Sequence, residues 1–203
     1  NNVSIDDNTE AGIATLNEAF GSPRTGQSYT FVVADLSNVQ RTVSMTAAQI
    51  TKTPVQNVST INTASGRVGY MTFNDHILPA EGQLVGAFTQ LASAGISDLV
   101  LDLRYNGGGF LYIASEIAYM VAGSTRTAGK TFERLQFNDK RTADTNNPRN
   151  NTPFYNVASG EPNTGTAANT PLPTLNLNRV YVLASPGTCS ASEAIVNGLR
   201  GVG

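Results

Sequence analysis

The sequence predicts an α/β fold built on a largely parallel sheet. Short apolar runs, typical of buried strands, alternate with longer segments of helical spacing along residues 67–199. Two of these runs, at 98–103 and 179–184, lead directly into turns of small residues that precede helical segments. Because ligand sites in parallel α/β sheets lie beyond the carboxyl ends of the strands, we expect both turns to face one cleft.

Residues 1–50 are expected to form part of a separate small domain. Apolar residues recur at helical spacing in 9–20, after a run of Asp and Asn that can cap a helix. Two strands are expected at 29–35 and 39–46, and the second alternates apolar and polar residues. Residues 47–54 resemble a linker. The elements before it bury little surface by themselves, which separates them from the longer part of the chain.

Residues 51–203 are expected to form the larger domain. Its predicted strands are 67–73, 98–103, 131–137 and 179–184, and its predicted helices are 81–95, 110–122 and 190–199. The stretch 139–176 lacks periodicity and is rich in Asn, Thr, Pro and Gly. That composition predicts a long loop, poorly packed and partly mobile.

Composition excludes several classes of protein. The net charge is -2, so no strong field favours nucleic acid, and no apolar run approaches the roughly 20 residues that span a bilayer. One Cys and one His exclude a metal site built from those residues, and the dinucleotide pattern G-x-G-x-x-G is absent. We therefore expect no metal and no cofactor. The charged fraction of 14% is typical of exported proteins, so a periplasmic or extracellular location is expected.

The first turn, 102–109, reads DLRYNGGG. Consecutive glycines leave backbone N–H groups uncovered, and such groups can bind an anion or a developing oxyanion. The alternative is a tight turn that needs glycine only for its geometry.

The second turn places Ser190 at the start of a helix, in GTCSASE (187–193). The helix dipole would favour an alkoxide there, and the N–H of Ala191 could meet an oxyanion. Ser190 and Glu193 also match a capping box, so the serine could simply cap the helix.

Together, DLRYNGGG (102–109) and TCSASEAI (188–195) resemble the paired signatures of the C-terminal processing (tail-specific) serine peptidases, family S41. Their order along the chain matches that family, as does RVGYMTF (67–73) ahead of both. The resemblance implies a crotonase/ClpP-like peptidase core over 51–203, truncated at its C-terminal end. It also implies that 1–50 is the C-terminal part of a PDZ-like domain, which binds peptides by strand addition.

The resemblance further implies that Ser190 is the nucleophile of an endopeptidase that cleaves polypeptides near their C-termini through an acyl-enzyme. The oxyanion hole would comprise the amide of Ala191 and the glycine turn at Gly107 or Gly108. The family's general base is a lysine that follows the nucleophile at a distance, which places it beyond Gly203. No lysine within 1–203 stands in a matching motif.

Several alternatives remain open from the sequence. Cys189 replaces a small residue of the family pattern, and we expect it to be buried or disulfide-bonded rather than nucleophilic. His76, the only histidine, is expected to be structural, although it could serve as a base. The chain could also be a non-catalytic relative that binds a peptide or ligand. A third possibility is an acyl-thioester enzyme that uses the glycine turn and does not need Ser190.

Overall fold

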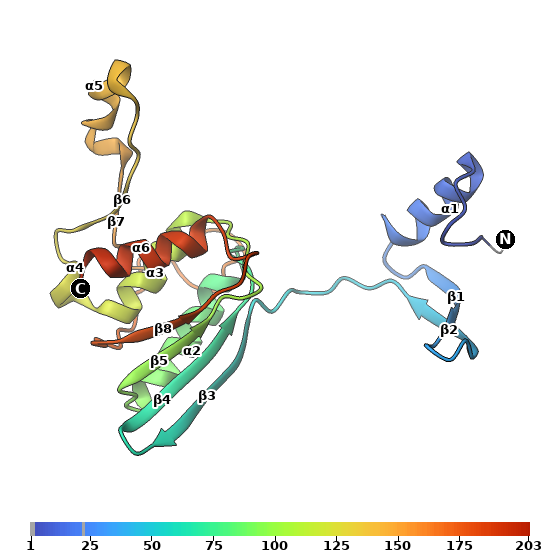
Figure 1. Ribbon diagram of the computed structural model, residues 1–203, viewed down its shortest axis with the longest axis horizontal. Helices are drawn as coiled ribbons and strands as arrows, with labels where there is room; N and C mark the ends of the chain where they lie inside the picture. Colours follow the sequence, from blue (N-terminus) through green and yellow to red (C-terminus); the bar gives the residue numbers. More distant parts are fainter. Residues whose placement is uncertain (1–2, 22) are drawn as a thin grey trace. The chain divides into compact units, whose positions relative to one another are not determined.

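The computed structural model describes residues 3–21 and 23–203, and the chain divides into two compact units between Thr51 and Lys52. Figure 1 shows the elements of both units along the chain. The division falls inside the segment 47–54, which has no regular secondary structure.

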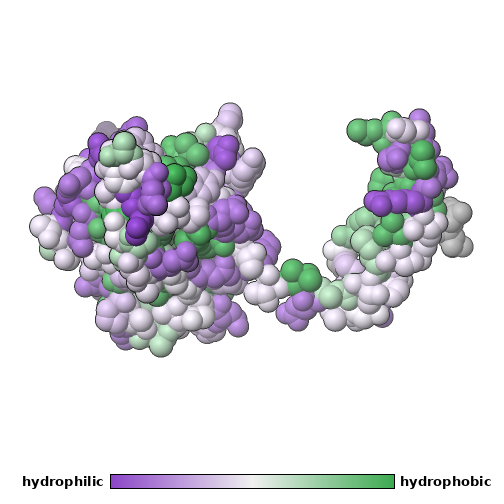
Figure 2. Space-filling view, turned by 90° about the horizontal axis from the view of Figure 1, so that it is seen from below, coloured by the Kyte–Doolittle hydropathy of each residue, from purple (hydrophilic) through white to green (hydrophobic). Residues whose placement is uncertain are grey.

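The N-terminal unit consists of one helix and one strand pair. Helix α1 (Glu10–Phe20) is capped by Thr9, whose Oγ1 accepts a hydrogen bond from the N–H of Gly12 at 3.1 Å. Strands β1 (Ser28–Ala34) and β2 (Gln40–Thr46) pair antiparallel. Among the described residues of this unit only Gly12 is buried, and Figure 2 shows hydrophobic residues on its surface. A helix and two strands cannot enclose a core, as their sequence suggested.

The C-terminal unit is built on a mixed, largely parallel sheet. Its strand order is β3-β4-β5-β8, with bounds Val55–Thr63, Gly66–Phe73, Asp98–Asp102 and Val180–Leu183. Strands β4, β5 and β8 are parallel, whereas β3 pairs antiparallel with β4. The predicted α/β class and the parallel core are therefore confirmed.

Strand β3 was not predicted from the sequence, and a β-bulge explains why. The pairing with β4 shifts register between Gln56 and Ser59, where Asn57 has a φ of 55°. The extra residue breaks the period-two pattern that identifies a strand, so the apolar positions Val55 and Val58 fall three residues apart.

Three long helices pack with the sheet around one core. They are α2 (Ala80–Ser93), α3 (Leu111–Ala122) and α6 (Ala191–Gly201). One face of β4 and β5 is buried against these helices. The buried residues are Met71, Phe73, Leu99 and Leu101, together with Leu103, which follows β5. The other face of the sheet presents Tyr70 and Asp102, together with the exposed Tyr181 and Leu183 of β8. This packing fixes the carboxyl ends of β4, β5 and β8 beside the starts of α3 and α6.

The segment after α3 departs from the prediction. A short helix α4 (Ser124–Thr127) leads to a hairpin of β6 (Thr131–Arg134) and β7 (Asn151–Pro153), which projects from the unit in Figure 1. Between these strands lie η1 (Asp139–Arg141), α5 (Thr142–Thr145) and η2 (Pro148–Asn150). Strand β6 ends three residues before the predicted bound of 137.

The stretch 139–176 was expected to be poorly packed, and for its second half that expectation is wrong. Phe154, Ala158 and Leu172 are buried in the core cluster, and Thr164 is 1% exposed. The buried apolar residues of this part stand alone at irregular spacing. Because they form no periodic pattern, the sequence did not predict that this part is packed. We call residues 154–172 the strap.

Among residues 3–21 and 23–203, no helix combines the length and apolar character needed to cross a membrane.

Candidate active site

The two turns predicted to share a cleft meet in the structure. Ser190 precedes the first residue of α6, and Gly108 lies against it. A Cβ atom added to Gly108 would lie 2.7 Å from the Cβ of Ser190 and 3.0 Å from the amide nitrogen of Ala191. Only glycine permits this approach, since Gly108 also has a φ of 106°.

Ser190 has a backbone conformation that ordinary helix caps do not have. Its φ of 54° and ψ of -119° lie outside the extended region in which capping residues sit. Such a conformation costs on the order of 1–3 kcal/mol for a residue with a side chain. The Glu193 carboxylate accepts a hydrogen bond from the N–H of Ser190 at 2.8 Å, as the capping-box pattern predicted. Capping explains Glu193, but it does not explain the strain at an exposed serine.

Asn106 orders the glycine turn from beneath. It is fully buried, and its Nδ2 donates to the carbonyl of Phe73 at 3.0 Å. Its Oδ1 accepts from the N–H of Gly108 at 3.0 Å and faces Nδ1 of His76 at 2.9 Å. Because Oδ1 can only accept, Nδ1 of His76 carries the proton.

His76 therefore supports the turn, as its structural assignment predicted. Burial lowers the pKa of His76 to about 4, although its bond to Asn106 acts in the opposite direction, so the ring is neutral at pH 7. Its backbone N–H donates to the carbonyl of Gly108 at 3.2 Å, and its ring packs edge-on against Phe73. Within the described residues, its Nε2 has no partner, and no hydrogen bond joins it to Ser190.

The amides near Ser190 differ in their availability. The N–H of Gly108 is engaged by Asn106, which removes it as a free donor in this arrangement. The N–H groups of Ala191 and Gly107 make no hydrogen bond to any residue in 3–21 or 23–203. The first amide of a helix has no intrahelical acceptor, so the N–H of Ala191 is open to a ligand.

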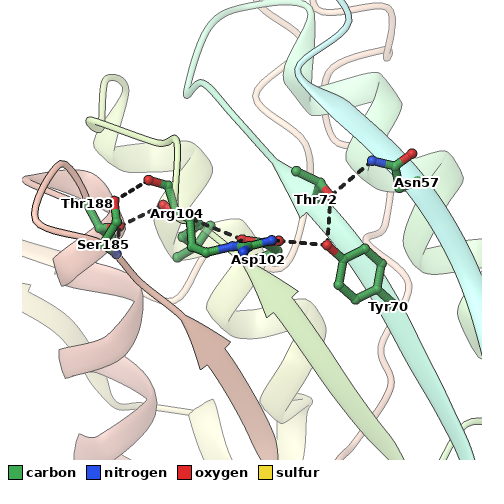
Figure 3. A network of polar contacts seen from close by, with 8 residues as sticks. Asn57, Tyr70, Thr72, Asp102, Arg104, Ser185 and Thr188 are labelled. Carbon is green, nitrogen blue, oxygen red and sulfur yellow. Dashed lines mark hydrogen bonds and ion pairs between the residues drawn. The ribbon is translucent and has the colours of Figure 1, made fainter.

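A polar network joins the sheet to the first turn, as Figure 3 shows. The Asp102 carboxylate accepts two side-chain bonds from Arg104, at 2.9 and 2.6 Å, and one from the Tyr70 hydroxyl at 2.6 Å. Thr72 donates to that hydroxyl and in turn accepts from Asn57. The bonds from Arg104 hold the pKa of Asp102 far below its ordinary value, so this buried carboxylate is ionised. The same carboxylate also accepts a hydrogen bond from the backbone N–H of Arg104 at 3.2 Å.

The turn before Ser190 is fastened to the end of β5. Thr188 donates from Oγ1 to the carbonyl of Leu103 at 2.8 Å and accepts from the N–H of Ser185 at 2.9 Å. The Ser185 hydroxyl donates to the carbonyl of Arg104 (Figure 3). These bonds hold the two strand-to-helix junctions in register.

Cys189 is exposed, which corrects the expectation of a buried residue. Its backbone turns inward, because its N–H donates to Asn106 and its carbonyl accepts from Ser192. The side chain is consequently directed outward at the start of the helix.

A cavity of about 420 Å³ lies beside Ser190. It extends along the first turns of α6 to Asn197 and is closed on another side by Phe132 and Glu133 of β6. Neither of the β6 residues was identified from the sequence, because they stand more than 50 residues from Ser190 in a segment without a motif.

The lysines do not reach this cavity. Lys52 pairs with Asp75 at 3.4 Å, and Lys130 and Lys140 are exposed; none of the three lines the cavity. The titratable side chains in its lining are the carboxylates Glu133 and Glu193.

Comparison with known proteins shows which family the chain resembles. A model of peptidase family S41 matches residues 67–203. A chloroplastic C-terminal processing peptidase of Tetradesmus obliquus is 33% identical over 93 residues, which are 40% of this chain and 19% of that protein. A crystal structure described as an S41 protease of Bacteroides fragilis superposes with a TM-score of 0.59 at 25% identity, covering 85% of this chain and 44% of that one.

The chain thus spans less than half the length of the relatives that it matches. The matched region contains both turns, the cavity beside Ser190, strands β5 and β8, and all of β4 except its first residue. The chain belongs to peptidase family S41.

Proposed function

We propose that this protein is a serine endopeptidase that cleaves polypeptides near their C-termini, with Ser190 as the nucleophile. The observation that carries the proposal is the strained backbone of Ser190 at a helix start, with the open amide of Ala191 beside it. Strain of this kind persists where a side chain must be presented in one orientation, as at the nucleophile elbow of other hydrolases.

In the proposed reaction, the Ser190 hydroxyl attacks the carbonyl carbon of the scissile peptide bond, and its proton passes to a general base. The tetrahedral oxyanion accepts hydrogen bonds from the N–H of Ala191 and from the glycine turn. Gly107 offers an unengaged amide, whereas Gly108 would have to share its N–H with Asn106. The amine product leaves, an acyl-enzyme remains on Ser190, and water hydrolyses it.

The base is proposed to be a lysine outside residues 1–203. A serine hydroxyl needs an adjacent base, and neither carboxylate of the cavity is suited to that role in this arrangement. Glu193 already accepts from the backbone of Ser190, and no hydrogen bond joins Glu133 to Ser190 within the described residues. His76 is engaged through Nδ1 below the glycine turn.

Two further parts of the proposal concern the rest of the protein. Residues 1–50 would belong to a PDZ-like domain that holds the substrate tail beside α1 by strand addition. The protein would be exported to the periplasm or the extracellular space, which its low charged fraction of 14% supports. Cell fractionation of the full-length protein tests the second point, since a cytoplasmic location would contradict it.

Trapping the acyl-enzyme tests the chemistry. A peptide ester is mixed with full-length protein, the reaction is quenched in acid, and the digest is examined by mass spectrometry. We expect the acyl mass on the peptide that contains Ser190, present in Cys189→Ala and absent in Ser190→Ala. The Cys189→Ala control is needed because Cys189 is adjacent to Ser190 and its thiol is exposed, so the thiol could also accept the acyl group. An adduct that follows Cys189 instead would refute the serine mechanism.

A further inference from the structure

The cavity beside Ser190 has an apolar part and a polar part. Leu111, Phe132 and Ala194 provide apolar surface, and Glu133, Glu193 and Asn197 provide polar groups. Its volume of about 420 Å³ lies in the range of ligand-binding sites. A substrate side chain next to the scissile bond would enter a space of this character.

The two carboxylates of the cavity are not equivalent. Glu193 is engaged, because its Oε2 accepts from the N–H of Ser190 at 2.8 Å. Glu133 makes no ion pair with any residue of the described chain, and its Oε2 is buried without a hydrogen-bond partner there. The half-buried Glu133 side chain lines the cavity, so a carboxylate without a cationic partner in the described chain is available to a ligand there.

The position of Glu133 is set by its strand. It pairs with Thr152 of β7 in the two-stranded hairpin, and the neighbouring Phe132 packs on Gly198 of α6. A Cβ on Gly198 would lie 2.4 Å from the Phe132 ring, so this contact is close. The hairpin is therefore anchored on the helix that Ser190 begins, which holds Glu133 at the wall of the same cavity.

We propose that Glu133 selects a basic residue, lysine or arginine, beside the bond that is cleaved. The aliphatic part of such a side chain would lie along Leu111 and Phe132, and its cationic end would pair with the carboxylate of Glu133. Long basic side chains bury their methylene groups and keep the charged end at a polar partner. This inference rests on the proposed peptidase function and names its specificity.

The test begins with cleavage sites. Full-length protein digests unfolded casein, and mass spectrometry identifies the residues that flank each cut. We expect lysine and arginine to be enriched on one side of the cut for the wild type and for Asp139→Asn. Asp139 is an exposed carboxylate of the same hairpin that does not line the cavity, so it controls for a change of charge. The enrichment should disappear in Glu133→Gln.

Paired peptides then quantify the preference. They differ only in lysine, norleucine or glutamate at the enriched position, and kcat/KM is measured for each. In the wild type we expect kcat/KM for the lysine peptide to exceed that for the norleucine peptide about tenfold, since one charge-assisted hydrogen bond contributes about this much. In Glu133→Gln the two values should be about equal. Glu133→Lys should favour glutamate. The ratio within one variant does not depend on how much of that variant is folded.

The outcomes separate this inference from the proposed function. The wild type could hydrolyse the lysine and norleucine peptides with equal kcat/KM, or the ratio of the two values could be the same in Glu133→Gln as in the wild type. Either result overturns the role of Glu133 and leaves the peptidase proposal standing. If the wild type cleaves no peptide and no casein, the proposed function fails and this inference fails with it.

Discussion

Replacing Glu116 by glutamine should stabilise the protein at neutral pH. Glu116 of α3 and Glu81 of α2 are buried side chains, with exposed fractions of 1% and 0%. Burial would raise the pKa of Glu81, but hydrogen bonds from Ser159 outweigh it and its pKa lies below the ordinary value. Burial, together with the negative charge of Glu81, raises the pKa of Glu116 to about 9. Glu116 is therefore protonated in the folded state.

The magnitude follows from the linkage between protonation and folding. Between pH 4.5, the ordinary value, and about 9, the folded state holds a proton on Glu116 that the unfolded state has released. Stability therefore falls as pH rises through this window, by ~1.4 kcal/mol per pH unit. At pH 7 the accumulated cost is about 3 kcal/mol. Glutamine is neutral in both states, so Glu116→Gln should remove most of that cost and gain little at pH 4.5.

Urea denaturation of wild type and variant at pH 4.5, 5.5, 7 and 8 measures this difference. Glu161→Gln is the matched control, because Glu161 is an exposed carboxylate of the strap and its loss should change stability by less than about 0.5 kcal/mol. Glu81→Gln should instead destabilise, because Glu81 accepts from the N–H and hydroxyl of Ser159 at 2.7 and 2.6 Å. A Glu116→Gln effect that does not grow with pH would show that Glu116 is ionised when folded, and would refute the reasoning.

Three further predictions address the site and the strap. Gly108→Ala should lower kcat/KM at least 100-fold, since the new Cβ would collide with Ser190. The control Gly86→Ala places its Cβ in open space on α2 and should leave activity unchanged, so equal effects of the two substitutions would contradict this. Thr188→Val should lower the unfolding free energy by about 1–3 kcal/mol, because it removes both hydrogen bonds of that hydroxyl; an unchanged urea midpoint would contradict this. In hydrogen exchange the Ser159 amide, bonded to Glu81, should be protected while amides of 138–150 exchange quickly, and uniform rates would contradict this.

The parts that followed from the sequence are those with a strong local signal. The apolar runs of β4, β5 and β8 and the spacing in α2, α3 and α6 were recognisable because buried elements leave a periodic pattern. The closeness of Gly108 and Ser190 also followed, since each turn comes after a parallel strand and the carboxyl ends of such strands share one edge.

The parts that did not follow depend on contacts between distant residues. Phe132 and Glu133 reach the cavity only because the β6–β7 hairpin packs on α6, and four residues of β6 carry no motif. The strap is held by Glu81, which precedes Ser159 by 78 positions. The outward direction of Cys189 depends on backbone bonds to Asn106 and Ser192, which composition does not reveal.

Hydrolysis of casein by three proteins tests the central claim most directly: full-length protein, its Ser190→Ala variant and the fragment 1–203. Full-length protein should degrade unfolded casein, and Ser190→Ala should lose that ability while keeping its urea midpoint. The fragment should be nearly silent, since a general base typically contributes ~10²–10⁴ in rate and none is proposed within these residues. Full activity of Ser190→Ala would contradict the assignment of the nucleophile. A fragment as active as the full-length enzyme would place the base within residues 1–203 and contradict the lysine proposal.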